Sequence, residues 1–127
     1  MTEGNIFLFP KSEDDHMWTI ISDPVIDRHN VVIVKFHSFN DYPDQQRACV
    51  IYAGEHRFFS HATYVDFAGA YLTTDAKLES LKRSGHLKLR NRDLGSILLA
   101  KIRAGVPDSR IPLECEKVLE AQGLLPG

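Results

Sequence analysis

The feature that most constrains the fold is one apolar run, NVVIVKFHSF (residues 30–39), which is typical of a buried β-strand. Residues 31–34 are all β-branched, and such side chains favour an extended backbone. The unbroken apolar start predicts burial on both faces, as in a closed barrel or beneath a helix. Polar and apolar residues then begin to alternate from Lys35.

Other stretches in the first 74 residues also have strand composition and end at turn-forming residues. NIFLF ends at Pro10, HMWTIIS ends at Asp23-Pro24, and Gly54 follows ACVIYA. TYVDFAGAYLTT predicts one strand, or a pair interrupted at Gly69. Between them, FNDYPDQQR (39–47) is a polar loop long enough to border a site. The additional strands are therefore expected at 5–9, 16–22, 48–53 and 63–74.

After Thr74 the spacing of apolar residues becomes helical. TTDAKLESLKRSG has Thr74 or Asp75 as the N-cap and Gly85 as the C-terminal stop. A second helix is expected from about Asn91 to Gly105, and a third after Asp108-Ser109 with Pro112 in its first turn.

This order predicts one α+β domain over residues 1–127, in which helices pack on a small, mostly antiparallel sheet or barrel. Residues 1–74 would supply the strand-rich part, and residues 75–127 the helical part. A chain of 127 residues with 43% hydrophobic and 25% charged residues can bury such a core without a disulfide or a structural metal.

The composition also indicates where in the cell the protein lies, the state of its cysteines and a positively charged segment. No apolar run reaches the roughly 20 residues that cross a bilayer, and the first residues do not resemble a signal peptide, so we expect a cytoplasmic protein with no membrane partner. Cys49 and Cys115 lie in predicted regular elements, and we expect buried free thiols. Residues 77–110 carry nine Lys or Arg and three Asp or Glu, a balance of 9 - 3 = +6 that would attract phosphates.

The polar groups most suited to chemistry gather in YAGEHRFFSHATYVDFAGAYL (52–72). His56 and His61 flank RFFS, so a bend there would bring both imidazoles to one end of the sheet beside Glu55 and Arg57. Histidine serves as base or acid because its ordinary pKa is about 6.5. The alternative is that both histidines are loop residues with ordinary hydrogen bonds. For His37 the alternative is packing at the edge of the core, and for His16 it is a turn before a strand.

Several short segments together resemble one family. These segments are GNIFLF, TIISD, VVIVKFHS, HATYVDFAGAYLTTDAKLESL and SGHLKLRNRDLGSILLAKI. In their order they are similar to the MazF/PemK family of toxin proteins, which are small SH3-like barrels encoded in toxin-antitoxin modules. The resemblance covers residues 4–104, and the helix from about Ile111 onward looks like an addition.

The resemblance implies a homodimeric endoribonuclease that cuts single-stranded RNA without a metal or other cofactor, and an antitoxin as protein partner. It also shows departures. The family's catalytic arginine, in an Arg-Pro pair before the second strand, is replaced by DDHMW with His16 near that place, and its Thr-Ser pair is replaced by His37-Ser38. We therefore expect histidines to carry the chemistry, with His56 and His61 as acid and base. His16, His37, Ser38 and Arg57 would orient or neutralise the phosphate.

Contacts to RNA are expected mainly from the basic segment KRSGHLKLRNR (82–92), with salt-sensitive binding. Its alternative reading is a solvated helix end and loop. Hydroxyl groups near His61 would add hydrogen bonds to a phosphate or base. The expected substrate-binding residues are Arg57, Thr63, Tyr64, Lys82, Arg83, Lys88 and Arg90.

Two rival functions remain open at this stage. A non-catalytic barrel would bind a protein partner, such as an antitoxin or a topoisomerase subunit, and the missing arginine favours it. A metal-dependent hydrolase would use Glu55, His56 and His61, although their spacing matches no established ligand motif. A chelator would abolish the activity of the second rival and leave a metal-independent ribonuclease unaffected.

Overall fold

The apolar run forms the central strand of the molecule. In the computed structural model, which describes residues 1–13 and 15–126, it is strand β3 (Val31–Ser38). Val32 and Val34 point into one hydrophobic core, whereas Val31 and Ile33 point into a second core on the other face of the sheet. The predicted burial of this strand on both faces is confirmed.

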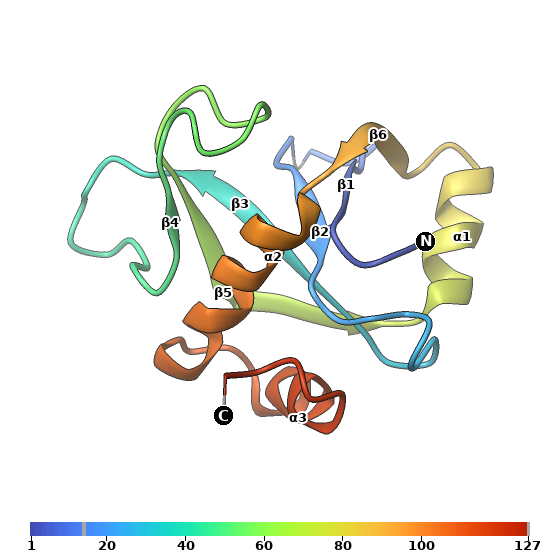
Figure 1. Ribbon diagram of the computed structural model, residues 1–127. Coiled ribbons are helices and arrows are strands. Elements are labelled where there is room, and N and C mark those ends of the chain that lie inside the picture. Colours follow the sequence, from blue (N-terminus) through green and yellow to red (C-terminus); the bar gives the residue numbers. More distant parts are fainter. Residues whose placement is uncertain (14, 127) are drawn as a thin grey trace.

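The described residues form one curled, all-antiparallel half-barrel sheet of six strands (Figure 1). Strand order across the sheet is β4-β5-β3-β2-β1-β6, so β4 and β6 are the two edge strands. The strands around β3 are β1 (Asn5–Leu8), β2 (Trp18–Ile20), β4 (Val50–Ile51), β5 (Thr63–Thr73) and β6 (Lys88–Asp93).

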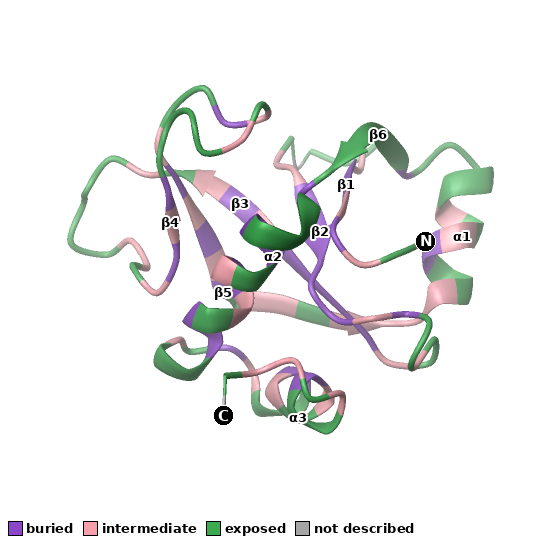
Figure 2. Ribbon diagram, in the orientation of Figure 1, coloured by how far each residue is buried: buried purple, intermediate pink, exposed green. Residues whose placement is uncertain are grey.

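Helices cover both faces of this sheet. Helix α2 (Gly95–Gly105), the short 3-10 helix η1 (Val106–Asp108) and α3 (Leu113–Ala121) supply side chains to the larger core. Helix α1 (Asp75–Arg83) covers the smaller core on the other face. Figure 2 shows the buried residues along β2 and β3 and on the inner sides of the helices. The predicted α+β class with a mostly antiparallel sheet is confirmed.

The helix expected from Asn91 is wrong at its start. Residues 88–93 form β6, which pairs with β1 and is exposed along its whole length (Figure 2). Charged residues are common on such an edge strand because they discourage pairing with another chain. The α2 helix begins only at Gly95, which has a positive φ of 76° and whose N–H donates to Asp93 Oδ1 over 3.1 Å. The predicted helical part 75–127 therefore contains a strand.

Two strands are shorter than expected. Strand β2 is limited to Trp18–Ile20, where 16–22 was expected, and β4 to Val50–Ile51, where 48–53 was expected. Strand β5 is a single strand with a bulge, since Lys35 pairs with Asp66 whereas Ile33 already pairs with Tyr71. The bulge needs a glycine at position 69, because a Cβ there would lie 2.7 Å from Asp66 Oδ2.

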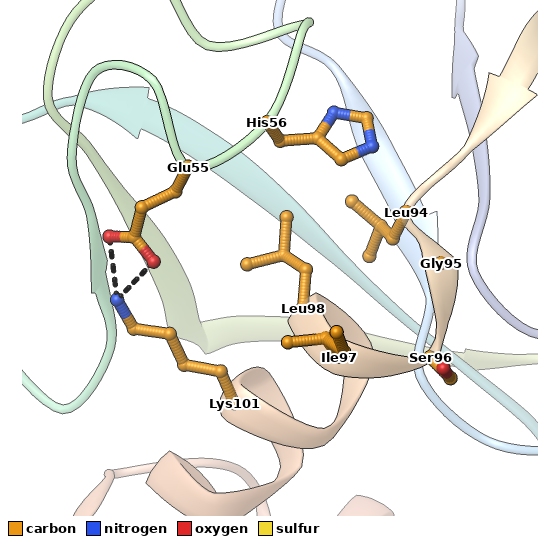
Figure 3. A pocket seen from close by; sticks show the side chains of 8 residues that line it. All are labelled: Glu55, His56, Leu94, Gly95, Ser96, Ile97, Leu98 and Lys101. Carbon is orange, nitrogen blue, oxygen red and sulfur yellow. Dashed lines mark hydrogen bonds and ion pairs between the residues drawn. The ribbon is translucent and has the colours of Figure 1, made fainter.

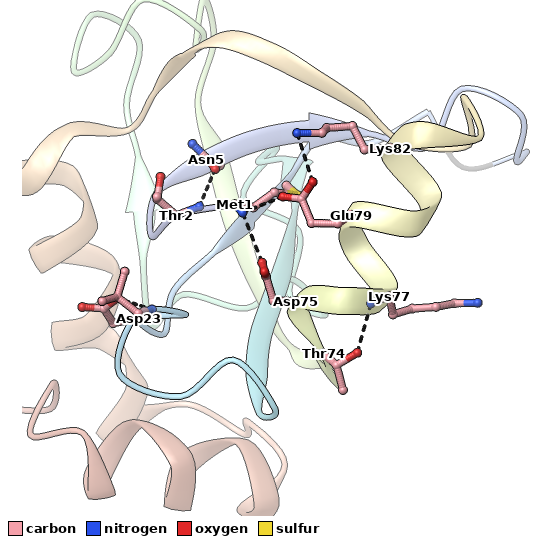
Figure 4. A network of polar contacts seen from close by, with 10 residues as sticks. Met1, Thr2, Asn5, Asp23, Thr74, Asp75, Lys77, Glu79 and Lys82 are labelled. Atoms are coloured by element: carbon pink, nitrogen blue, oxygen red, sulfur yellow. Dashed lines mark hydrogen bonds and ion pairs between the residues drawn. The ribbon is translucent and has the colours of Figure 1, made fainter.

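Both termini of helix α1 are capped as the sequence predicts, and two of its acidic side chains bind the N-terminus of the chain. Thr74 is its N-cap, with Oγ1 accepting from the Lys77 N–H over 3.1 Å, and Gly85 follows its last turn with a positive φ of 79°. The Met1 α-amino group contacts Asp75 Oδ1 at 3.1 Å and Glu79 Oε1 at 2.7 Å (Figure 4).

The cysteines match their prediction. Cys49 and Cys115 are buried and unbridged, and burial raises the pKa of each thiol to about 11, so neither is a thiolate near neutral pH. As for the membrane, none of the helices within residues 1–13 and 15–126 has the length and apolar character to cross one.

Candidate functional site

A small pocket of about 160 Å³ lies at the end of β3. The segment before β2, the start of β5 and the loop 52–62 complete its wall. We call it the Ser38 pocket. It is lined by Asp15, His16, Met17, Phe36, His37, Ser38, Phe58, Phe59, His61 and Thr63. Three of the chain's six histidines thus meet beside one serine.

The Ser38 pocket is reached from both faces of β3. His37 and Ser38 are successive residues of a strand, so their side chains leave it in opposite directions. Ser38 pairs with Thr63 and lies on the same side as Phe36, which belongs to the larger core. His37 pairs with Tyr64, and its side chain leaves β3 on the opposite face of the sheet. Because both residues line the pocket, it lies at the end of the strand and not on one face of the sheet.

His61 is held against Ser38. Its Nε2 lies 2.9 Å from Ser38 Oγ, and its Nδ1 lies 3.4 Å from Ser60 Oγ. The backbone is fixed as well, because the buried Thr63 hydroxyl donates to the His61 carbonyl oxygen over 3.1 Å. Hydroxyls donate or accept, so these partners are compatible with either neutral tautomer or with the protonated ring.

His37 is packed between two rings and bound to a carboxylate. Its ring lies 4.2 Å from the His16 ring and 5.2 Å, nearly parallel, from the Tyr64 ring, measured between centroids. Nε2 lies 3.2 Å from Asp66 Oδ2. In the antiparallel register Asp66 is a diagonal neighbour of His37, because it pairs with Lys35.

The pKa values of this pair set their charges. Burial and the nearby His16 lower the pKa of His37 below 6.5, although Asp66 opposes the shift. Burial opposes ionisation of Asp66, but hydrogen bonds from Gln46, Gly69 and His37 outweigh it and lower the pKa of Asp66 below 3.8. Near neutral pH Asp66 is therefore a carboxylate, which only accepts hydrogen bonds. Nε2 of neutral His37 must carry the proton, and Nδ1 keeps its lone pair.

Asp66 and Gln46 are site residues that the sequence did not reveal. Gln46 Nε2 donates to Asp66 Oδ1 over 2.7 Å, and the Gly69 N–H donates to the same oxygen over 2.9 Å. Gln46 belongs to the loop 39–47, which supplies no residue to the lining of the Ser38 pocket and reaches His37 only through Asp66. The one available signal was Gly69 within a strand pattern, because a glycine inside a strand often marks a bulge.

His56 does not line the Ser38 pocket. Its Nε2 lies 3.0 Å from the Asp93 carbonyl oxygen, and its Nδ1 accepts from the Phe58 N–H over 3.3 Å. Its ring stacks on that of Phe58, with centroids 5.3 Å apart, and Phe58 in turn lines the pocket. The structure thus brings His61 to one pocket with His16, His37 and Ser38. His56 lies outside this pocket and is separated from it by the Phe58 ring.

His56 borders a different cavity of about 410 Å³ on the side of α2 (Figure 3). Beside it, both carboxylate oxygens of Glu55 bind Lys101 Nζ at 2.8 Å. Glu55 Oε1 also accepts from the Tyr52 N–H over 2.8 Å. This ion pair ties the loop 52–62 to α2.

The expected substrate-binding residues fall in three places. Thr63 and Tyr64 begin β5 next to the Ser38 pocket. Arg57, in the loop 52–62, lines a cavity with Asp93, and Arg90 of β6 lies over the Phe58 ring of the same loop. Lys88 begins β6 opposite Leu8. Lys82 and Arg83 lie apart in the last turn of α1, where Lys82 pairs with Glu79 at 3.2 Å.

The metal-binding alternative finds no ligand set. Glu55 is bound to Lys101, His56 to the backbone and His61 to Ser38, so the three side chains do not converge. Across the described part of the chain, no group of three or more His, Cys, Asp or Glu side chains is arranged to hold a metal ion.

Comparison of the chain with protein-family models, with curated proteins and with solved structures finds no match in any of the three.

Proposed function

We propose that the protein is a MazF/PemK-like toxin on an SH3-like barrel, and that it cuts single-stranded RNA as a metal-independent endoribonuclease. One observation carries the proposal: His16, His37 and His61 line one small pocket with Ser38, and a carboxylate fixes the tautomer of His37. The resemblance of residues 4–104 to the family supports the same reaction.

The reaction needs a base for the ribose 2′-hydroxyl and an acid for the leaving oxygen. His37 Nδ1 takes the proton of the 2′-hydroxyl, and the 2′-oxygen forms a bond to phosphorus. The bond from phosphorus to the 5′-oxygen breaks, and His61 in its protonated form gives a proton to that oxygen. In-line displacement separates the attacking and leaving oxygens, which suits His37 on one face of β3 and His61 of the loop, which contacts Ser38 on the opposite face. The products are a 2′,3′-cyclic phosphate and a 5′-hydroxyl.

Charge on the phosphorus oxygens needs stabilisation in the absence of the family's arginine. Among the described residues that line the Ser38 pocket there is no arginine or lysine. In this proposal His16, when protonated, supplies the positive charge, and the Ser38 hydroxyl donates a hydrogen bond.

The test is incubation of purified protein with mixed-sequence RNA in EDTA, followed by analysis of the ends of the fragments. We expect cleavage that leaves 2′,3′-cyclic phosphates, and a loss of at least about a hundredfold in His37→Gln. The matched control is His29→Gln, since His29 is exposed in the turn before β3, at the other end of that strand from Ser38. Activity that needs a metal ion, or an absence of cleavage by folded wild type, would refute the proposal.

The proposal extends to assembly, because the family resemblance implies a homodimer whose activity an antitoxin blocks. Light scattering on the eluting protein should give twice the 14.4 kDa of one chain. A mass of one chain would contradict the homodimer and leave the chemistry of the pocket to be judged separately.

A second candidate is a non-catalytic barrel that binds a protein partner, such as an antitoxin or a topoisomerase subunit. The observation that favours it is the cavity beside α2, where Ile97 is 88% exposed next to Leu94 and Leu98 (Figure 3). A lone exposed apolar side chain is ordinary, but an exposed apolar surface at a groove marks an interaction site, so Ile97 and the cavity together favour this candidate. Under this function Ile97→Asp would abolish the biological effect, whereas His37→Gln would leave it intact.

A further inference from the structure

A second polar cavity adjoins the proposed active site on the side of β6. It has a volume of about 570 Å³ and lies between residues 54–57 of the loop and residues 91–93 of β6. We call it the β6 groove. Its lining includes Arg57 and Arg92, and β6 is an edge strand that is exposed along its length.

Strand β6 contains a bulge beside its basic residues, which are all exposed. Asn5 pairs with Asp93 and Phe7 pairs with Leu89, so one residue of β1 lies opposite the three residues 90–92 of β6. Such bulges redirect side chains and interrupt pairing. The guanidinium of Arg90 lies over the Phe58 ring, with Cζ 5.7 Å from the ring centroid.

Phe58 connects the β6 groove with the Ser38 pocket. Its ring lines the pocket and stacks on His56, which lines the groove. The Arg90 guanidinium lies over the same ring. Its side chain is only partly buried. Aromatic rings of this kind, next to arginines, are the platforms on which single-stranded nucleic acids stack their bases.

The charges around the β6 groove favour a polyanion. Arg57, Arg92 and the neighbouring Arg90 are cationic, whereas the carboxylate of Glu55 is already bound to Lys101 through both oxygens. Asp93 is the other acidic residue in the lining, and its Oδ1 accepts from the Gly95 N–H. The positive groups therefore outnumber the carboxylates that a phosphate would meet.

We infer that the β6 groove holds the backbone of single-stranded RNA and that a base next to the scissile phosphate stacks on Phe58 in the place of the Arg90 guanidinium, which turns to a phosphate. Arg57, Arg90 and Arg92 contact the phosphates on the groove side. The inference rests on the proposed ribonuclease activity and gives it an entry path. A duplex does not fit this arrangement, because its bases are stacked on one another and do not reach an aromatic platform.

The experiment measures binding without chemistry. A fluorescein-labelled 2′-O-methyl RNA of mixed sequence lacks the attacking hydroxyl, so its anisotropy reports affinity alone. We expect Phe58→Leu, which keeps apolar bulk but removes the π-face, to bind about tenfold more weakly. The double variant Arg90→Ala/Arg92→Ala should bind more weakly and reduce the slope of log K against log salt by about 1.4, or about 0.7 for each phosphate contact.

The matched control is Arg110→Ala, because this exposed arginine between η1 and α3 borders neither cavity. Its affinity and salt slope should equal those of the wild type. Equal losses in Arg110→Ala and in the β6 double variant would overturn the inference, as would wild-type affinity in Phe58→Leu. Melting curves of each variant establish that the folded fraction is the same.

Two competitors identify the ligand class. An unlabelled duplex of the same sequence and a glutamate oligopeptide of equal charge should both compete at least about tenfold less well than the single strand, since neither stacks a base. Equal competition by either one would refute a single-strand groove. Loss of binding in the variants without any RNA cleavage by wild type would support the groove and refute the proposed function. If wild type cleaves RNA and both Phe58→Leu and Arg90→Ala/Arg92→Ala keep wild-type cleavage and binding, the proposed function is supported and the groove is refuted.

Discussion

His56 and His61 belong to the same loop, yet the surroundings of their ring nitrogens differ. Both nitrogens of His56 contact backbone groups, the Asp93 carbonyl oxygen and the Phe58 N–H. One neutral tautomer, with the proton on Nε2, satisfies both contacts. The nitrogens of His61 contact the hydroxyls of Ser38 and Ser60, and its side chain lines a pocket.

These surroundings suit His56 to holding the loop in place and His61 to exchanging a proton. A ring that bridges two backbone groups fixes the loop only while it stays neutral, so protonation at Nδ1 would cost the contact to Phe58. A ring that faces rotatable hydroxyls keeps its partners in either protonation state. Exchange of a proton with a substrate is therefore compatible with the position of His61 and costs structure at the position of His56.

The largest effect is expected at His61. We predict that His61→Gln lowers the rate of RNA cleavage at least about a hundredfold, because it removes the proposed acid. The rate is measured in EDTA under single-turnover conditions, with His29→Gln as the control. A reduction of less than about fivefold would place the acid elsewhere and break the distinction between the two histidines.

The next effect concerns the partner of His37. We predict that Asp66→Asn slows cleavage about tenfold to a hundredfold, less than the loss of an acid or base, since Asp66 positions the imidazole without contacting substrate. The pH dependence gives a second readout. The active form of His37 is neutral, so the rate rises as pH increases through its pKa, which lies below 6.5.

The carboxylate raises the pKa of His37, so its removal should move the acidic limb of the pH–rate profile to lower pH. An unchanged limb in Asp66→Asn would show that His37 is not the base. A limb displaced to higher pH would contradict the sign of the interaction.

The bulge in β5 provides a weaker test of the same contact. We predict that Gly69→Ala lowers the free energy of unfolding by about 1–3 kcal/mol, because the added methyl group overlaps the Asp66 carboxylate. Cleavage should fall in the same direction as in Asp66→Asn. Chemical denaturation measures the stability, and Ala68→Ser in the same bulge serves as the control. Wild-type stability in Gly69→Ala would show that the carboxylate can move without loss.

The smallest effect is expected at His56. We predict that His56→Gln lowers the free energy of unfolding by about 1 kcal/mol, the amount typical of a lost hydrogen bond. The rate of cleavage per folded molecule should change less than about threefold, well below the effect of removing an acid or base. Wild-type stability combined with a large loss of rate would reverse the assignment of the two histidines.

The parts of the fold that the sequence predicts well are those with a local cause. The β-branched run of β3 and the capping residues of α1 determine their own backbone conformations. Strand β6 was missed because its residues are basic and exposed, so it has no apolar pattern and is a strand only through pairing with β1.

The site was predicted in part, for a related reason. The sequence indicates that His16, His37, Ser38 and His61 are polar groups near strand ends, and the structure brings them to one pocket. The contact between His37 and Asp66 depends on the register of β3 and β5 and on the bulge at Gly69. Register follows from long-range packing, so a single sequence does not specify it. The backbone contacts that distinguish His56 from His61 have the same origin.

The most direct test of the central claim compares two matched variants, His37→Gln and His56→Gln, at equal folded fraction. Single-turnover cleavage of one RNA in EDTA gives the ratio of their rates. Our interpretation predicts that His56→Gln is faster by at least about thirtyfold, because of these two histidines only His37 exchanges a proton with the substrate. Equal rates, or a slower His56→Gln, would contradict this interpretation and indicate that the active site lies beside His56 and not in the Ser38 pocket.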